Sequence, residues 1–311
     1  MQQKIGIIGS GLIGSSWALV FARAGCEVMV YDRDPDTFAM SGQYIWENLE
    51  ALAAYEMLAD PEAVYRRIGF TPRLEEALEE AGYVQESVFE QLEVKRDVFE
   101  RIDPLLKPGT IVGSSTSGIP ASRFTQSLSN RRACLIAHPV NPPHLIPLVE
   151  IVPAPWTDAA TVAATRQLME TVGQVPILVN GEIEGFILNR LQGALLNEAW
   201  WLYQEGYATA DDIDKTVRDG LGLRWTFMGP FQTIDLNSPK GIAEYAERLS
   251  PLYLSVARSR SDPQPWSRDA VHRAEQEVSP KRVGGEIQQS RLWRDKLLLA
   301  LKKWKLDAGL K

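Results

Sequence analysis

A glycine-rich turn lies between an apolar run and a helix-like segment near the start of the sequence, and it limits the folds open to this chain. Residues 4–34 read "KIGIIGSGLIGSSWALVFARAGCEVMVYDRD". Ile5, Ile7 and Ile8 form a β-branched run without a polar break, which is typical of a central parallel strand covered on both faces. The segment predicts a strand, a tight turn, a helix and then a second strand from Val28 to Tyr31.

The turn contains the spacing G-x-G-x-x-G at Gly9, Gly11 and Gly14. In this pattern the first glycine permits the sharp turn, the second lets backbone amides approach a pyrophosphate, and the third lets helix and strand pack closely. The phosphates would lie at the helix N-terminus, at Leu12 and Ile13, where unpaired N–H groups and the helix dipole favour negative charge. A glycine triplet alone is a weak signal, because any tight strand-to-helix turn is rich in glycine.

An acidic residue follows this turn at the spacing expected for a dinucleotide site. Asp32 lies about twenty residues beyond the turn, where a carboxylate accepts hydrogen bonds from the adenosine ribose hydroxyls. The same charge repels a 2′-phosphate, so the sequence predicts NAD in preference to NADP. Arg33 weakens that preference, since an arginine can bind the phosphate. The alternative is a tight turn followed by a solvated aspartate at a strand end.

The bulk composition excludes several classes of function. The chain has 311 residues and a net charge of −7, which disfavours a nucleic-acid partner. Cys26 and Cys134 match no metal-ligand spacing, and three histidines are too few for a histidine-built site, so we expect no metal. No apolar run approaches the roughly 20 residues of a membrane span. The first strand begins at Lys4, which leaves no room for a signal peptide, so we expect a cytoplasmic protein without a membrane partner.

Beyond the turn, strand-like and helix-like segments alternate as far as a glycine-flanked polar hinge at residues 180–185. Further strands are expected at 83–87, in "TIVGSSTSGI", "ACLIAHPVN", "LIPLVEIVP" and "VPILVN", whereas 34–81 is expected to be helical. After the hinge only helices are expected. The sequence predicts an α/β fold, a doubly wound Rossmann-type parallel sheet over 1–184, followed by an all-helical substrate and dimerisation domain over 185–311. Candidate core positions of the first helix after the hinge are Phe186, Leu191, Leu195, Leu196 and Trp200.

The segment "AHPVNPPHLIPLVEIVP" places a titratable pair, His138 and Glu150, on two apolar stretches joined by a proline-rich loop. An unpaired charge away from water is costly, so the two residues are expected to be partners. In a nicotinamide-dependent alcohol oxidation a group must take the hydroxyl proton, and histidine suits this role. A carboxylate on the other ring nitrogen would fix the tautomer and stabilise the imidazolium.

The residues alone leave a plainer interpretation open. His138 would then be a loop histidine with satisfied hydrogen bonds, and Glu150 a solvated residue at a sheet edge. His144, in the same loop, is expected to be a surface or packing residue, and His272 lies in a polar helix and is expected to be solvated.

Several motifs together resemble the L-3-hydroxyacyl-CoA dehydrogenase family over essentially the whole chain. They are "GIIGSGLIGSSWA", "ESVFEQLEVKRDVF", "SSTSGI", "HPVNPPHLIPLVEIV" and "GFILNRL". Within the family, "YVQES", "GLGLRWTFMGPFQTIDLN" and "WRDKLLLALKKWK" are most similar to the branch that contains λ-crystallin and L-gulonate 3-dehydrogenase. The resemblance implies an NAD-dependent dehydrogenase that forms a homodimer. The helical domain is rich in tryptophan, and candidates for a dimer surface are Trp200, Trp201, Trp293 and Trp304, although from the sequence alone such aromatics are more often core than interface.

The resemblance also implies roles for individual residues. His138 and Glu150 correspond to the family's catalytic pair, Ser117 to its substrate-oriented serine and Asn189 to its catalytic asparagine. Residues that match cofactor-lining positions of the family are Glu86, Lys95, Ser117 and Asn141. The related 6-phosphogluconate and 3-hydroxyisobutyrate dehydrogenases carry a catalytic lysine at the position of Asn189, which disfavours that class.

Two features favour a small free acid as substrate over an acyl-CoA. CoA-using members of the family carry a lysine-rich helical segment after the second strand, but residues 34–65 contain neither lysine nor arginine. Arg224 stands where acyl-CoA members have an uncharged residue, and its guanidinium can bind a carboxylate through two hydrogen bonds. We therefore expect oxidation of a free L-3-hydroxy acid such as L-gulonate. The alternatives are an L-3-hydroxyacyl-CoA substrate, an Arg224 that only pairs with an acid, and a crystallin-like or NAD-binding protein without catalysis.

Overall fold

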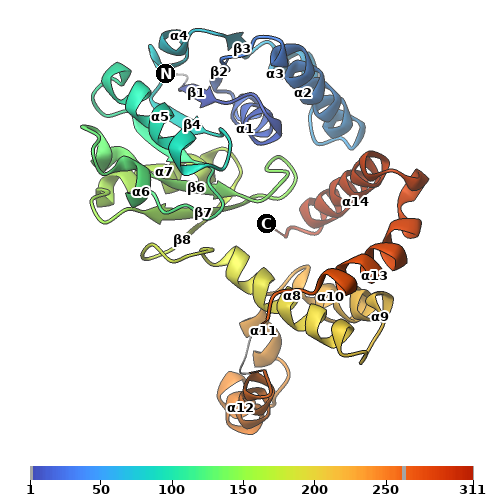
Figure 1. The fold of residues 1–311 in the computed structure, drawn as a ribbon. Coiled ribbons are helices and arrows are strands. Elements are labelled where there is room, and N and C mark those ends of the chain that lie inside the picture. Colours follow the sequence, from blue (N-terminus) through green and yellow to red (C-terminus); the bar gives the residue numbers. More distant parts are fainter. Residues whose placement is uncertain (1–2, 261–263, 311) are drawn as a thin grey trace. The chain divides into compact units, whose positions relative to one another are not determined.

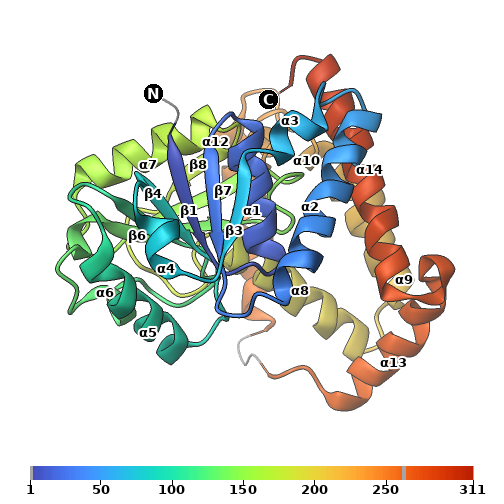
Figure 2. The ribbon, with the colours of Figure 1, turned by 90° about the horizontal axis from the view of Figure 1, so that it is seen from above.

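The computed structural model describes residues 3–260 and 264–310 and contains an eight-stranded sheet (Figures 1 and 2). The strands are β1 Lys4–Ile8, β2 Glu27–Tyr31, β3 Ile68–Thr71, β4 Tyr83–Glu86, β5 Ile111–Ser114, β6 Cys134–Pro139, β7 Leu148–Pro153 and β8 Val175–Leu178. Their order is β3-β2-β1-β4-β5-β6-β7-β8, and all neighbours from β3 to β6 pair in parallel. The predicted Rossmann-type sheet is confirmed, except that β7 runs antiparallel to β6.

Helices cover both faces of this sheet. Those on the first face, which share one apolar cluster, are α1 Leu12–Arg23, α2 Thr37–Ala54, α3 Pro61–Tyr65 and α7 Ala159–Thr171. Those on the second face, which share another, are α4 Leu74–Leu78, α5 Leu92–Ile102 and α6 Ser122–Thr125. Short 3-10 turns follow α5 at Asp103–Leu105 and precede β6 at Arg131–Ala133. Strand β1 is buried from Ile5 to Ile8, which explains the apolar run of its sequence.

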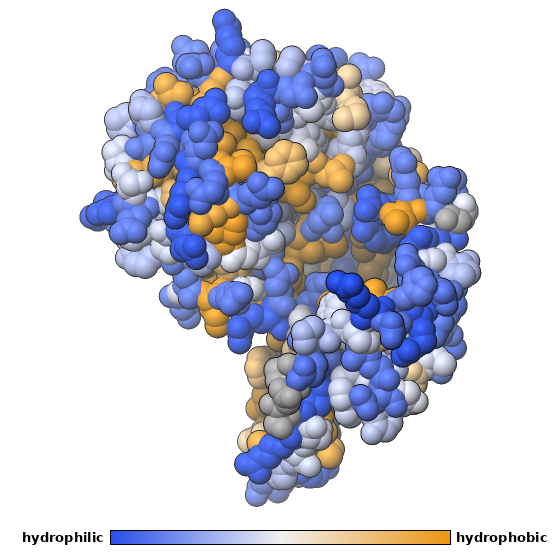
Figure 3. Space-filling view, viewed as in Figure 1, coloured by the Kyte–Doolittle hydropathy of each residue, from blue (hydrophilic) through white to orange (hydrophobic). Residues whose placement is uncertain are grey.

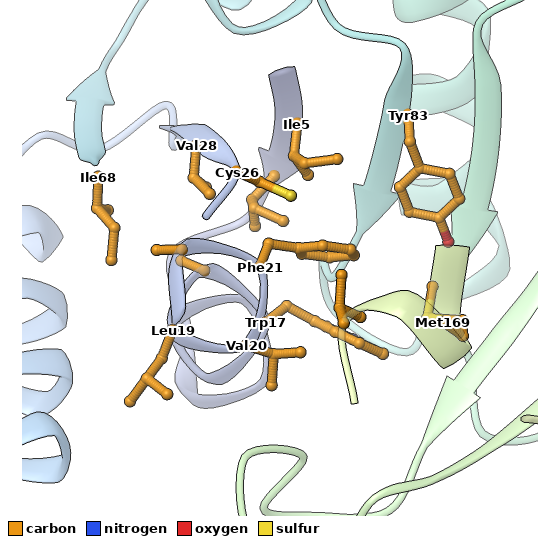
Figure 4. Packing of buried hydrophobic residues seen from close by; sticks show 14 of the residues in the cluster. Ile5, Trp17, Leu19, Val20, Phe21, Cys26, Val28, Ile68, Tyr83 and Met169 are labelled. Carbon is orange, nitrogen blue, oxygen red and sulfur yellow. The ribbon is translucent and has the colours of Figure 1, made fainter. Parts of the chain in front are cut away.

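The core of the first face is centred on α1 (Figure 4). Trp17 and Phe21 stack with ring centroids 5.4 Å apart, and Phe21 lies 5.8 Å from the ring of Tyr83 on β4. Both α1 rings are fully buried. Truncating either ring to alanine is expected to cost about 3–5 kcal/mol of stability. This packing fixes the start of α1, and with it the glycine turn, at the carboxyl end of β1.

The prediction that 34–81 is entirely helical was wrong at Ile68–Thr71, which forms the edge strand β3. Its four residues, IGFT, are a short run in which Gly69 separates the apolar Ile68 and Phe70, so the local strand signal is weak. Pairing with β2, in the register Val28 to Ile68, determines its conformation, so the strand depends on tertiary context more than on local propensity.

The chain divides into two compact units. One comprises the chain up to Gln192 together with Asp295–Asp307, and the other comprises Gly193–Arg294 and the residues from Ala308. The predicted boundary at 184 falls earlier than this division, because the start of α8 Leu188–Gln204 is bonded to β7, as described below. Among the described helices, none is both long and apolar enough to span a membrane.

The second unit is helical over the described residues, as predicted. Beyond α8 its helices are α9 Ala210–Lys215, α10 Gly222–Trp225, α11 Pro230–Asp235, α12 Ile242–Arg258, α13 Arg268–Val278 and the first part of α14 Ile287–Asp307. A π-helical turn spans Thr216–Leu221, and 3-10 turns span Ser279–Lys281 and Val283–Gly285. Phe186 is fully buried, but the expected core residues Leu191 and Leu196 are 64% and 37% exposed, so that prediction was wrong for both.

Candidate active site

The glycine turn between β1 and α1 has the geometry of a phosphate cradle. Gly9 has φ of 105°, in the left-handed region that favours glycine, and a Cβ at Gly14 would lie 1.9 Å from the Gly9 carbonyl oxygen. Gly11 differs, because a Cβ there would meet nothing within 4 Å. The fold itself therefore does not require glycine at this position, whereas a ligand approaching the backbone would. No side chain caps α1, which begins at Leu12 and Ile13, so its first amides can bind an anion.

Asp32 lies directly beside this turn, just after β2. Its Oδ2 accepts hydrogen bonds from the backbone N–H and the hydroxyl of Ser10, both at 2.9 Å. Its Oδ1 accepts a bond from the Asp34 amide at 3.2 Å. The carboxylate is thus held against the glycine turn and partly exposed, where a ribose bound along the turn would meet it.

Glu86 and Lys95, predicted to line the cofactor, form a buried ion pair. Their side chains are 0% and 1% exposed, and the Lys95 ammonium donates to both Glu86 oxygens at 2.9 and 3.1 Å. Glu86 also accepts bonds from the Ser114 hydroxyl and the Val88 amide. The pair joins the ends of β4 and β5 to α5. Contact of either side chain with a cofactor stays a prediction.

Sequence reasoning missed Glu90, which organises the loop after β5. One of its oxygens, Oε1, accepts hydrogen bonds from the Thr116 hydroxyl at 2.7 Å, the Ser117 amide at 2.8 Å, the Ser117 hydroxyl at 3.1 Å and the Gly118 amide at 3.2 Å. The other oxygen lies 3.4 Å from the Lys95 ammonium. Burial acts to raise the pKa of Glu90, but the hydrogen bonds from Thr116 and Ser117 and the Lys95 charge outweigh it and lower the pKa.

His138 and Glu150 face each other as register partners on the antiparallel strands β6 and β7. Their side chains meet with Nδ1 of the ring 2.8 Å from Oε2 of the carboxylate. Glu150 is fully buried and the His138 side chain keeps 8% of its surface exposed. The ring also packs on Phe186, with centroids 5.6 Å apart. The predicted partnership is therefore present, and the plainer interpretation of a solvated Glu150 was wrong.

Glu150 also binds the start of α8. Its second oxygen, Oε1, accepts hydrogen bonds from the backbone amides of Ile187 at 2.8 Å and Leu188 at 2.9 Å. Burial acts to raise the pKa of the carboxyl, but the hydrogen bonds from His138, Leu188 and Ile187 outweigh it and lower the pKa. The Glu150 carboxylate is consequently ionised at neutral pH and accepts a hydrogen bond from Nδ1–H of His138. The other ring nitrogen, Nε2, is then the one that can accept a proton.

Ser117 and Asn189 are brought together by the fold. The Asn189 side-chain amide donates to the Ser117 carbonyl oxygen at 2.7 Å, and the Ser117 side chain is exposed. Asn141 is exposed at the start of the proline-rich loop, and Arg224 is exposed on α10 in the second unit. His144 is 1% exposed, so of the two alternatives it is a packing residue, and His272 is exposed on α13, as expected. Within the described ranges no group of three or more His, Cys, Asp or Glu residues is arranged to hold a metal ion.

A dinucleotide cradle at the carboxyl end of a parallel sheet and an oriented histidine on the same sheet define the class of nicotinamide-dependent oxidoreductases. Residues 4–183 match the family model of the 3-hydroxyacyl-CoA dehydrogenase NAD binding domain, and 185–283 match that of its C-terminal domain. The chain belongs to the 3-hydroxyacyl-CoA dehydrogenase family, and NAD is its cofactor.

Similar proteins indicate to which branch of the family the chain is related. The chain is 36% identical to a human lambda-crystallin homolog over 304 residues, 96% of this chain and 95% of that protein. It is 35% identical to an L-carnitine dehydrogenase of Streptomyces coelicolor over 287 residues, 91% of this chain and 86% of that protein. A solved structure of an NAD+ dependent dismutase, 5-formyl-3-hydroxy-2-methylpyridine 4-carboxylic acid 5-dehydrogenase, has a TM-score of 0.83 at 27% identity, with full coverage of both chains. The predicted relation to the λ-crystallin branch is confirmed.

Proposed function

We propose that the protein oxidises the C3 hydroxyl of a small free L-3-hydroxy acid to the 3-keto acid with NAD, and that His138 is the base. The observation that carries this proposal is the contact of 2.8 Å between His138 Nδ1 and the buried Glu150 carboxylate. A histidine held in this way has one nitrogen fixed as donor and the other available to take a proton.

Each residue has one task in the proposed reaction. Bound NAD supplies the acceptor for the hydride that leaves C3 of the substrate. His138 Nε2 takes the hydroxyl proton as the carbon–oxygen double bond forms, and Glu150 stabilises the resulting imidazolium. Ser117 and Asn189, joined at 2.7 Å, orient the reacting oxygen. Asp32 binds the adenosine ribose and disfavours a 2′-phosphate, which supports NAD in preference to NADP.

The preference for a free acid rests on charge. Helix α2 lies within residues 34–65, which carry no lysine or arginine, so this segment offers no attraction to the phosphates of CoA. Arg224 provides an exposed guanidinium that can bind a carboxylate in two hydrogen bonds. L-Carnitine and the pyridine carboxylic acid named for two similar proteins are free acids, which supports the same substrate class.

An L-3-hydroxyacyl-CoA is the second candidate substrate. A relative from Gibberella moniliformis that is 37% identical over 255 residues is named 3-hydroxyacyl-CoA dehydrogenase, which favours it. A crystallin-like or NAD-binding role without catalysis is the third candidate. A protein without catalysis would not need the residues that match the family's catalytic positions. This chain has all four, with His138 bonded to Glu150 and Asn189 bonded to Ser117.

NADH formation by the purified protein distinguishes these candidates. L-Gulonate, L-carnitine and L-3-hydroxybutyrate are compared with 3-hydroxybutyryl-CoA, each with NAD and with NADP. We expect turnover of a free acid with NAD. Activity on the thioester alone would refute the proposed substrate class, and NAD binding without turnover on any substrate would favour the non-catalytic role.

The role of Arg224 is tested separately. Arg224→Met is expected to raise KM for the free acid by about tenfold or more, because it removes a charged hydrogen-bonding partner. Arg218→Met is the matched control, since Arg218 is also exposed but pairs with its neighbour Asp219. Equal KM values in the two variants would exclude Arg224 from substrate binding.

We further propose a cytoplasmic homodimer that forms through the second unit. Helix α12 has no buried residue, and its Leu252, Tyr253, Leu254 and Val256 are each at least 46% exposed. Trp293 of the same unit is 51% exposed, and so is Trp304, which belongs to the first unit. Figure 3 shows hydrophilic residues over most of the face in view, with hydrophobic patches between them. Apolar surface on this scale is typical of a protein interface. Sedimentation equilibrium that gives only monomer at micromolar concentration would refute this proposal.

A further inference from the structure

The last helix, α14, lies beyond both matched family models, which end at residues 183 and 283 (red in Figures 1 and 2). Its segment Asp295–Asp307 belongs to the same compact unit as the sheet. Leu299 in this segment is only 3% exposed and is part of the apolar cluster around α1, and Leu298 packs against that cluster. The family's two domains therefore do not account for this contact.

The same cluster includes residues of the proline-rich loop between β6 and β7. Leu145 is 5% exposed within it, and Ile146 packs against it. The backbone amides of both residues donate to the Pro142 carbonyl oxygen at 3.0 Å. The loop is thus a compact turn whose apolar side chains share a core with Leu299.

A polar contact also joins α14 to this loop. The ammonium of Lys302 donates a hydrogen bond to the His144 carbonyl oxygen at 2.9 Å. His144 is held in turn, because its Nε2 lies 2.8 Å from Asn48 Oδ1 and its ring packs edge-on against Tyr44. Asn48 donates its own side-chain amide to the Tyr44 carbonyl, so its Oδ1 is the acceptor of this contact. The His144 ring thus anchors the loop to α2, and Lys302 anchors it to α14.

Lys302 occupies an unfavourable position for a cation. Burial, with a smaller contribution from the charge of Arg23 on α1, lowers its pKa to about 8. Burial, together with the charges of Arg23 and Lys302, lowers the pKa of His144 to about 3, so that ring is neutral. Within the described residues, no ion pair of Lys302 with a carboxylate is found. A methionine would fill the same space without this desolvation cost, so what the lysine specifically contributes is the bond to the loop.

We propose that Lys302 is a positioning residue for the His138–Glu150 pair, because it clamps the loop that joins β6 to β7. His138 and Glu150 lie directly opposite each other on these strands, and Val140–Pro147 is the connection between them. A loop fixed at His144 from two sides holds the strands in the register that makes the 2.8 Å contact. The kinetic part of this proposal rests on the proposed function, whereas the structural part does not.

The test compares Lys302→Met with two reference variants of the full chain. Lys303→Met is the matched control, because Lys303 pairs with Asp307 on its own helix. Lys302→Arg tests rescue, since it restores a cationic donor. Amide hydrogen exchange of peptides that cover Leu145 and Ile146 is measured by mass spectrometry, together with kcat and KM for NAD and for the acid substrate.

In Lys302→Met we expect exchange in the loop to accelerate about tenfold, as for the loss of one hydrogen bond to a charged group. We expect kcat to fall by a similar factor while KM for NAD is unchanged, because the glycine turn is not part of this contact. Lys303→Met should match the wild type, and Lys302→Arg should recover most of both effects. Unchanged loop exchange in Lys302→Met, or equal changes in Lys303→Met, would overturn the proposal. Absence of wild-type turnover on every acid would refute the proposed function only, and exchange would still decide on the clamp.

Discussion

Replacing Glu150 with glutamine removes the charge that stabilises a protonated His138 and leaves the volume unchanged. With the ring and carboxylate in contact at 2.8 Å, the charge centres are roughly 4 Å apart. At an effective dielectric constant of about 20, two unit charges at that distance interact by about 4 kcal/mol. A barrier raised by this amount corresponds to a decrease of about 10³-fold in kcat. The glutamine amide can also face Nδ1 and favour the wrong tautomer, which acts in the same direction.

The assay is initial-rate NADH formation with saturating NAD and the best acid substrate. KM for NAD should stay within a factor of about two, because the glycine turn does not contact Glu150. Glu170→Gln is the matched control, since Glu170 is exposed and pairs with Arg166 on its own helix. Thermal unfolding of both variants establishes that they are folded. A folded Glu150→Gln protein with kcat within tenfold of the wild type would refute the role assigned to the pair.

Three further predictions concern the glycine turn, the Glu90 carboxylate and the Lys302 ammonium. Gly14→Ala should abolish NAD binding in calorimetry, because its Cβ would lie 1.9 Å from the Gly9 carbonyl oxygen; an unchanged Kd would contradict this. Glu90→Gln should lower kcat about tenfold, because the Ser117 turn loses a charged acceptor, and equal rates would count against that role. Lys302 has a folded pKa of about 8, below its ordinary value of 10.5, so the unfolded chain binds more protons between these values. The free energy of unfolding should therefore rise with pH between about 8 and 10.5, and it should rise more in the wild type than in Lys302→Met. The same pH dependence of the unfolding free energy in both proteins would contradict the lowered pKa of Lys302.

The glycine turn was predictable because its parts are local. Gly9, Gly14 and Asp32 lie in one strand–helix–strand segment. A side chain at either glycine would clash with nearby backbone, so the short glycine motif alone indicates the turn. The pairing of His138 with Glu150 was predictable for a related reason. Two ionisable residues in apolar segments need partners, and a single loop connects the two strands that carry them.

Glu90 was missed because nothing in its neighbourhood distinguishes it from other surface acids. It lies 26 to 28 residues from the groups that donate to it, and only the parallel pairing of β4 with β5 brings them together. Asn189 and Ser117, 72 residues apart, were identified by family resemblance, and their contact depends on tertiary structure in the same way.

After the hinge the helical structure was predictable, but the burial of its side chains was not. Leu191 stands four residues before Leu195, and Leu196 four residues before Trp200, as in apolar stripes, and yet Leu191 and Leu196 are exposed in the single chain. A periodic pattern indicates that a face is to be covered and carries no information on whether the same chain or another copy covers it. The contact of Leu299 on α14 with the apolar cluster around α1 was not predicted, because one buried residue on a helix leaves no apolar stripe in the sequence.

The placement of the proposed base and its carboxylate on adjacent strands has a consequence for how the protein folds. The two residues are separated by only 12 positions in the chain, so the entropy lost in bringing them together is that of one short loop. The proton relay can therefore assemble early, as a local event, before distant segments have docked. Docking of the distant segment around Lys302 would then fix the geometry of a relay that has already formed.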